Sequence, residues 1–255
     1  MTRDERRLAA KRALPMVDLT DLTDSSDEAA IDRLCARAQT AHGPVGAICI
    51  WPRLVSHAAS LLQGTGIPIA TVVNFPGGED DETAVCAMSE RALKEGAAEI
   101  DLVMPYRAFM EGETDRAAAM IKAVRSAMGS KPVLKVILET GELDDAELIH
   151  DASRLAINEG ADFIKTSTGK VAVNATLETA AIMLDVIKDC GGTVGFKPAG
   201  GIKTTEDTAD YLRLADDRLG LTWARPSRFR FGASGVLDDL LAALDGGTQK
   251  TSDEY

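Results

Sequence analysis

The chain has 255 residues, of which 45% are hydrophobic and 27% are charged, a composition typical of a globular protein with a large core. Its net charge of -12 argues against a nucleic-acid surface, and an aromatic content of 4% leaves few side chains to stack on bases. Four cysteines without Cys-x-x-Cys spacing and three scattered histidines predict no zinc site. No apolar run has the length of a membrane span or a signal-peptide core, so we expect a reduced, cytoplasmic protein.

Hydrophobic periodicity predicts strands that alternate with helices along the whole chain. The expected strands cover residues 16–20, 46–51, 67–75, 99–104, 133–139, 163–165, 193–197 and 228–232. The expected helices cover residues 2–14, 27–41, 53–63, 80–95, 113–128, 144–158, 176–189, 205–219 and 234–244. This count and order predict an α/β fold, a (β/α)8 TIM barrel with a short extra N-terminal helix, as a single domain over residues 1–245. The polar tail 246–255 is expected to be mobile.

An open, doubly wound sheet is the alternative fold for strands that alternate with helices. That fold commonly carries a Gly-x-Gly-x-x-Gly motif after its first strand, and no such motif follows residues 16–20 here. The sequence therefore favours the barrel.

Five charged residues interrupt strands that should be apolar on both faces, because helices cover a parallel sheet on each side. They are Asp18, Asp101, Lys135, Lys165 and Lys197. The carboxyl ends of barrel strands converge on one mouth, where active sites form, and buried charges need partners. We therefore predict a polar network in the barrel centre. A purely stabilising ion-pair lattice is the alternative, although buried charges are a costly way to stabilise a core.

Lys165 is the most informative of these residues, because its short strand breaks into a Thr/Ser/Gly turn that ends at Lys170. Desolvation, together with repulsion from Lys197 on the next strand, should lower a lysine pKa. The neutral amine attacks carbonyls and forms a carbinolamine and then an imine, while a nearby aspartate moves the protons. The alternative for Lys165 alone is a strand-end lysine with its ammonium in solvent.

Glycine-rich loops follow the last three predicted strands. They are Gly169-Lys170, Gly200-Gly201 and Gly232-Ala233-Ser234-Gly235, the last at the start of a helix. Backbone amides in such turns bind phosphate, and barrels commonly bind it after the seventh and eighth strands. The alternative is that these glycines serve only as turn residues. Together with the lysines, the loops indicate a Schiff-base enzyme that acts on a phosphorylated carbonyl compound.

Over nearly its whole length the chain resembles the deoxyribose-phosphate aldolases, in particular those of the enterobacterial type. The motifs that carry this resemblance are Met16-Val17-Asp18-Leu19-Thr20, Ala47-Ile48-Cys49-Ile50, Val73-Asn74-Phe75-Pro76, Asp101-Leu102-Val103-Met104-Pro105-Tyr106-Arg107, Leu134-Lys135-Val136-Ile137-Leu138-Glu139-Thr140-Gly141, the stretch 162–174, Gly195-Phe196-Lys197-Pro198-Ala199-Gly200-Gly201 and Arg230-Phe231-Gly232-Ala233-Ser234. The resemblance implies reversible cleavage of 2-deoxy-D-ribose 5-phosphate into acetaldehyde and D-glyceraldehyde 3-phosphate, without metal or organic cofactor.

The resemblance also implies a role for individual residues. The imine-forming lysine corresponds to Lys165, the second lysine to Lys197 and the proton-relay aspartate to Asp101. Supporting members of the proton network correspond to Asp18, Lys135 and Tyr255, the last on the tail. Phosphate binding is expected of Gly169, Lys170, Gly200, Gly201, Ser234 and Gly235. The family often has a second serine where this chain has Gly235, so one hydroxyl donor is missing while the backbone amide remains.

Two other interpretations compete with this one. The chain could be another Schiff-base barrel aldolase, which the choice of donor aldehyde would distinguish, or a non-catalytic protein that binds sugar phosphates, which would form no imine. An acidic interaction protein has little support, because it needs no lysines in barrel strands. The expected partners are a small phosphorylated sugar and acetaldehyde, with no nucleic acid or membrane. A homodimer is one expected assembly, since many related barrels dimerise through their outer helices.

Overall fold

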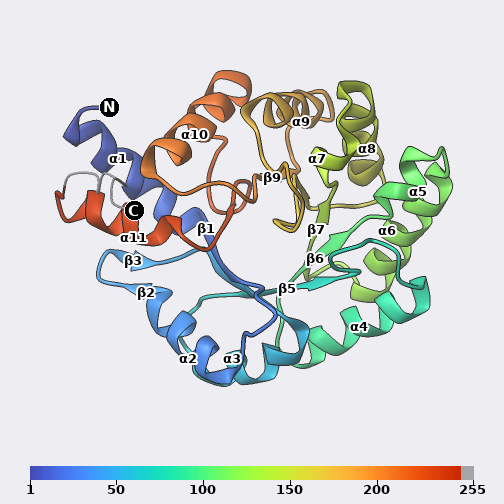
Figure 1. Cartoon of the computed structure of the whole chain (residues 1–255), viewed down its shortest axis with the longest axis horizontal. Helices are drawn as coiled ribbons and strands as arrows, with labels where there is room; N and C mark the ends of the chain where they lie inside the picture. The colour runs from blue at the N-terminus through green and yellow to red at the C-terminus, as the bar shows by residue number, and fades with distance from the viewer. Residues whose placement is uncertain (248–255) are drawn as a thin grey trace.

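A computed structural model describes residues 1–247 of the chain as a barrel of parallel strands surrounded by helices (Figure 1). The barrel strands are β1 (Val17–Asp21), β4 (Ala47–Ile50), β5 (Ile69–Val73), β6 (Glu99–Val103), β7 (Val133–Ile137), β8 (Phe163–Lys165), β9 (Gly195–Lys197) and β10 (Phe231–Ala233). Their order in the sheet is β10-β1-β4-β5-β6-β7-β8-β9, and every pairing is parallel.

The two edge strands of this sheet meet and close the barrel. Isolated parallel bridges join Phe196 to Phe229 and Ala199 to Gly232. The Gly232 amide donates to the carbonyl of Pro198 at 2.9 Å. This closure confirms the predicted (β/α)8 barrel, and the open doubly wound alternative is wrong.

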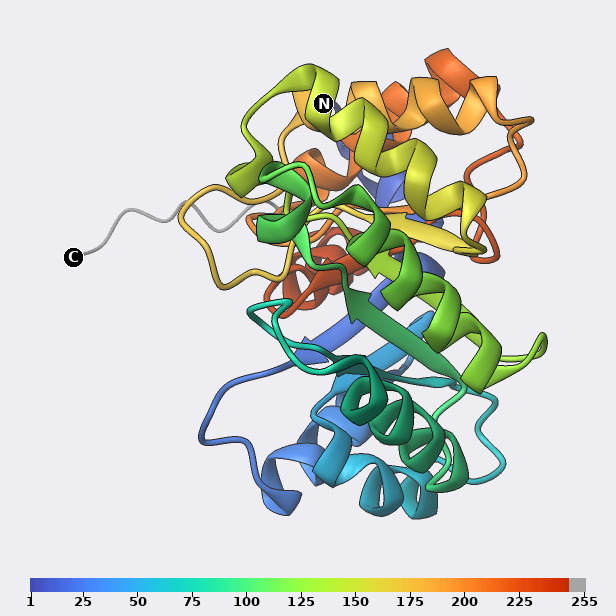
Figure 2. The ribbon, with the colours of Figure 1, turned by 90° about the vertical axis from the view of Figure 1, so that its right-hand side faces the viewer.

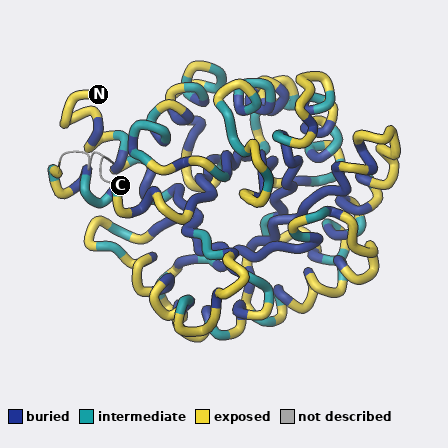
Figure 3. Tube along the Cα trace, viewed as in Figure 1, coloured by how far each residue is buried: buried dark blue, intermediate teal, exposed yellow. Residues whose placement is uncertain are grey.

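Helices follow the strands and form the outer layer of the barrel (Figure 1). They are α1 (Arg3–Ala13), α2 (Glu28–Arg37), α3 (Val55–Leu61), α4 (Glu82–Lys94), α5 (Tyr106–Met110), α6 (Thr114–Met128), α7 (Thr140–Leu143), α8 (Ala146–Asn158), α9 (Leu177–Asp189), α10 (Thr205–Leu219) and α11 (Val236–Leu244), with short 3-10 turns at Leu14–Met16 and Pro52–Leu54. Side-chain oxygens cap the amino ends of several of them, as Asp81 does for α4 and Asp145 for α8. The buried positions in Figure 3 follow the strands and the inner faces of these helices.

The predicted extra N-terminal helix is α1, and it packs against α10 and α11. Arg6 fastens it there, because its guanidinium contacts Glu206 at 3.1 Å and Asp239 at 2.6 Å. The same Asp239 carboxylate accepts the backbone amide of Thr205 at the start of α10. One buried cation therefore joins the first and last helices of the described chain.

The structure differs from the prediction at three places. Residues 39–44 form a small antiparallel hairpin of β2 (Gln39–Thr40) and β3 (Gly43–Pro44), so the helix predicted over 27–41 ends at Arg37. The last strand is shifted from 228–232 to 231–233, because residues 225–229 form a turn. Helices α5 and α7 were missed, since four or five residues are too few to show a helical period.

The loops that follow the strands gather at one end of the barrel, on the left of Figure 2. In barrels of this kind, that end carries the active site. Within residues 1–247, no helix is both long enough and apolar enough to cross a membrane. 

Candidate active site

The five predicted charged residues meet inside the barrel. The sheet register places Asp101 opposite Lys135 and Lys165 opposite Lys197. Side chains alternate across a strand, so residues two apart on one strand share the inner face. Four of the five are 0% exposed, and Lys165 is 2% exposed. This burial excludes the alternative interpretation in which Lys165 is a strand-end lysine with its ammonium in solvent.

Asp101 is the centre of this cluster. Its Oδ2 atom accepts from Lys165 Nζ at 2.8 Å and from Lys197 Nζ at 2.8 Å. Its Oδ1 atom accepts from Lys135 Nζ at 2.9 Å. Lys197 Nζ also donates to Asp18 Oδ2 at 2.5 Å. A single carboxylate oxygen therefore links the two lysines that the sequence singled out.

The sequence did not indicate two further members of this cluster, Glu99 and Arg230. Arg230 contacts Asp18 Oδ1 at 2.7 Å and Glu99 Oε1 at 2.9 Å, and Glu99 lies 2.5 Å from Lys135 Nζ. Glu99 is two residues before Asp101 on β6 and thus faces the same side, so strand periodicity could have identified it. Arg230 precedes β10 in the structure but lies inside the strand predicted over 228–232, so its charge could have identified it in the same way.

The carboxylates set the protonation of Lys197. Burial by itself lowers the pKa of this ammonium, but attraction to Asp101 and Asp18 outweighs burial and raises the pKa well above its ordinary value. The sequence argument on lysine pKa values rested on burial and on repulsion between Lys165 and Lys197. It considered two cations and omitted the acids that contact them.

The aspartates are held ionised by the same contacts. Burial opposes ionisation of Asp101, yet attraction to its three lysine partners holds the pKa of this carboxyl well below its usual range. The pKa of Asp18 is also lowered, since Lys197 and Arg230 outweigh burial. Both aspartates can therefore accept hydrogen bonds from ammonium groups at neutral pH.

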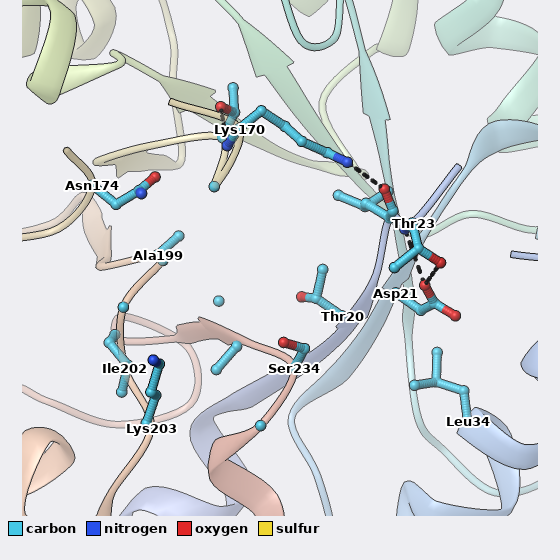
Figure 4. A pocket seen from close by; sticks show the side chains of 18 of the residues that line it. Thr20, Asp21, Thr23, Leu34, Lys170, Asn174, Ala199, Ile202, Lys203 and Ser234 are labelled. Carbon is cyan, nitrogen blue, oxygen red and sulfur yellow. Dashed lines mark hydrogen bonds between the residues drawn. The ribbon is translucent and has the colours of Figure 1, made fainter. Parts of the chain in front are cut away.

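A cavity of about 900 Å³ opens above this cluster at the loop end of the barrel (Figure 4). The predicted site residues that line it are Lys165, Gly169, Lys170, Gly200, Gly201, Ser234 and Gly235. Of the buried charged cluster in the described chain, Lys165 alone lines the cavity. Its amine is thus the member of the cluster that a bound molecule can reach.

The glycine loops form one side of this cavity. Gly200 and Gly201 have φ values of 84° and 82°, a left-handed backbone that favours glycine. A Cβ atom on Gly200 would come within 2.7 Å of Asn174. Within residues 1–247, the amides of Gly201, Ser234 and Gly235 donate no backbone hydrogen bond, so they are available to an anion. Lys203, which the prediction omitted, also lines the cavity (Figure 4).

The Lys170 side chain reaches across the cavity, away from the Gly200-Gly201 and Ser234-Gly235 loops. Its Nζ atom donates to the carbonyl of Leu22 at 2.8 Å, in the loop after β1, and Figure 4 draws this bond. Its backbone amide donates to Thr168 Oγ1 at 3.0 Å. Contact between Lys170 and a phosphate at the glycine loops therefore requires its side chain to leave Leu22.

Cys49, from one of the motifs that carry the family resemblance, takes no part in the charged cluster. Cys49 is buried against Ala70 and Val72, and burial raises the pKa of its thiol, as expected of a small hydrophobic residue. Tyr255 lies outside the described residues. In the described part of the chain, no group of three or more His, Cys, Asp or Glu side chains is placed to hold a metal ion.

Comparisons with known proteins agree with this architecture. The sequence profile described as DeoC/LacD family aldolase matches residues 12–236. A deoxyribose-phosphate aldolase of Agrobacterium fabrum strain C58 is 57% identical over 242 residues, which cover 94% of this chain and 93% of that protein. The crystal structure of a candidate deoxyribose-phosphate aldolase from Toxoplasma gondii ME49 has a TM-score of 0.86 at 26% identity, over 95% of this chain and 97% of that one. A candidate of the same kind from Coccidioides immitis has a TM-score of 0.79 at 29% identity, over 93% and 97% of the two chains.

Proposed function

Because the chain belongs to the DeoC/LacD family of aldolases, we propose that it reversibly cleaves 2-deoxy-D-ribose 5-phosphate into acetaldehyde and D-glyceraldehyde 3-phosphate. The reaction proceeds through an imine on Lys165. The observation that carries this assignment is that, within residues 1–247, Lys165 alone among the buried charged residues lines the cavity, while its Nζ atom lies 2.8 Å from Asp101.

The first step is attack of the neutral Lys165 amine on the C1 aldehyde of the open-chain sugar. After the attack, the nitrogen carries an extra proton and gives it to the Asp101 carboxylate, whose Oδ2 atom also contacts Lys197. The carbinolamine hydroxyl then leaves as water after it gains a proton from this pair, and the imine forms. Lys197 suits the role of a fixed positive charge beside Asp101, because its raised pKa keeps it an ammonium.

The second step breaks the carbon chain. A base removes the C3 hydroxyl proton, the electrons of the C2–C3 bond move toward the imine, and D-glyceraldehyde 3-phosphate departs. The enamine that remains is protonated at C2, and water hydrolyses the imine to release acetaldehyde. Tyr255 remains the predicted residue for moving the C2 proton. Asp18 and Lys135 support the reaction by holding Lys197 and Asp101 in place.

The glycine side of the cavity is the proposed phosphate site. Free backbone amides at Gly201, Ser234 and Gly235, at the start of α11, suit a dianion. Gly169 and Gly200 give the backbone the conformation it needs there, and Lys170 adds a cation to the wall of the same cavity. This local site is required because the net charge of -12 repels an anionic substrate from the molecule as a whole.

The test is borohydride trapping with acetaldehyde, followed by mass mapping of peptides. We expect an ethyl group on Lys165 that is absent when acetaldehyde is omitted. An adduct on Lys197 would reverse the roles of the two lysines. The absence of any adduct would favour the alternative function, a non-catalytic protein that binds sugar phosphates in the same cavity.

Assembly and location remain predictions. We expect a homodimer, and light scattering coupled to size-exclusion chromatography measures it directly. A monomer would remove that expectation without affecting the proposed chemistry, because Lys165, Asp101 and Lys197 all come from one chain. The cytoplasmic location is likewise proposed from the composition.

A further inference from the structure

Glu139 is a buried carboxylate that the proposed chemistry does not use. It follows β7, is 0% exposed, and within residues 1–247 its side chain hydrogen-bonds only to Thr168. Its φ of 59° is a left-handed conformation that residues other than glycine rarely adopt. A buried carboxylate and a strained backbone both oppose folding, and they persist where the surrounding structure or the function requires them.

The contacts of Glu139 lead to the loop after β8. Thr168 donates its backbone amide to Glu139 Oε1 at 3.1 Å and its hydroxyl to Oε2 at 2.5 Å. The same hydroxyl oxygen accepts the Lys170 amide at 3.0 Å. Glu139 thus determines which way the Thr168 hydroxyl points, and that hydroxyl in turn holds the turn 168–170.

This turn joins the two halves of the site. It begins three residues after Lys165, and Thr168, Gly169 and Lys170 all line the cavity. Burial raises the pKa of Glu139, and the hydrogen bonds from Thr168 and the charge of Lys165 offset only part of this rise. The end of β7 is tied to the same segment, since the Thr140 amide donates to the carbonyl of Thr166 at 2.9 Å.

We propose that Glu139 is a positioning residue for substrate phosphate, because it holds the 168–170 turn in the binding conformation through Thr168. It contacts no substrate itself. The inference rests on the proposed function in one respect, because it assumes that the 168–170 turn belongs to the proposed phosphate site. The competing explanation is that Glu139 acts as a charge beside Lys165. It predicts equal losses of activity on the phosphorylated and the unphosphorylated sugar.

The experiment compares Glu139→Gln with the matched control Glu142→Gln, which makes the same chemical change at an exposed residue of α7. Calorimetry with inorganic phosphate gives a dissociation constant that does not depend on catalysis. We expect about tenfold weaker binding in Glu139→Gln, since an NH2 group replaces one carboxylate oxygen and then faces a Thr168 donor instead of accepting from it, and no change in the control. We also expect KM for 2-deoxyribose 5-phosphate to rise about tenfold with kcat nearly unchanged, and kcat/KM for unphosphorylated 2-deoxyribose to stay within about twofold.

The outcomes separate the explanations. Unchanged phosphate affinity in a folded Glu139→Gln protein, or equal losses on both sugars, would overturn the proposal. Phosphate binding that weakens in a protein without aldolase activity would support the proposal while the proposed function fails. Thr168→Val supplies a second test. If the two residues act as a unit, the double variant binds phosphate no more weakly than Thr168→Val alone, whereas additive losses contradict the link.

Discussion

Lys165 and Lys197 share the Oδ2 atom of Asp101, but their surroundings differ. Lys197 contacts a second carboxylate, Asp18, and is fully enclosed, whereas Lys165 borders the cavity. One lysine is therefore accessible from the cavity, and the other is held as an ammonium behind it. This difference supports the proposal that Lys165 is the nucleophile.

Replacing either lysine with leucine should abolish turnover, but the effects on stability should differ. Lys165→Leu leaves Asp101 paired with two lysines, so we expect a folded, inactive protein. Lys197→Leu leaves Asp18 and Asp101 each without one partner in a buried site, and we expect a loss of about 3 kcal/mol in the free energy of unfolding. Urea unfolding of both variants measures this. Equal stabilities would show that the two lysines balance the buried acids alike, and retained activity in Lys165→Leu would remove the imine mechanism.

At the scale of elements, the loops after β8, β9 and β10 all contribute residues to the proposed phosphate site, but their backbones differ. The Gly200-Gly201 loop requires left-handed backbone, and a side chain at Gly200 would meet Asn174. The Ser234-Gly235 loop tolerates a side chain at its glycine. Gly235 has a φ of -105°, and a Cβ atom there would meet nothing within 4 Å. A serine hydroxyl can therefore be added at this position without distortion.

Gly235→Ser should improve both binding and stability. Gly235 is the N-cap of α11 and provides no side-chain cap, and serine caps helices better than glycine by a few tenths of a kcal/mol. A hydroxyl beside the free amides should lower KM for the phosphorylated sugar by about threefold, with little effect on the unphosphorylated one. Steady-state kinetics with both sugars and a thermal melt test this. A higher KM for the phosphorylated sugar would place the phosphate elsewhere in the cavity.

At the scale of the whole molecule, the closed barrel brings charges from five strands and one loop into one enclosed volume. This network links stability to pH. The lowered pKa of Asp101 means that its contribution is complete above about 3.9, the ordinary aspartate pKa, and is lost as pH falls through the lower folded value. The raised pKa of Lys197 means that its contribution is complete below about 10.4 and is lost as pH rises through the higher folded value.

We therefore expect the network to contribute full stability from about pH 5 to about pH 9 and to lose it at both extremes. Asp18→Asn should show a shallower loss of the free energy of unfolding between about pH 5 and pH 3 than the parent, because one carboxyl with a lowered pKa has been removed. Urea titrations at several pH values measure this slope. Asp217→Asn, at an exposed aspartate of α10, is the control. Identical slopes for Asp18→Asn and the control would contradict the assignment of acid sensitivity to the network.

The sequence by itself determined the order of strands and helices, the inward-facing charges and the glycine loops. Hydrophobic periodicity and turn chemistry are local, so a single chain carries them without reference to its fold. Charged residues in otherwise apolar strands were also informative, because they interrupt a local pattern that is visible in the sequence. The family resemblance then implied roles for Lys165, Lys197 and Asp101.

Only the tertiary structure decided which charges pair and in which direction each pKa moves. Arg230 reaches Asp18 across 212 residues of sequence, and Glu139 accepts the hydroxyl of Thr168 from the loop after the next strand. The sequence argument on lysine pKa values included a neighbouring lysine and not the two aspartates that closure of the barrel brings within 2.8 Å of Lys197 Nζ. A pKa is the sum of burial and all nearby charges, and that sum exists only once distant strands have met.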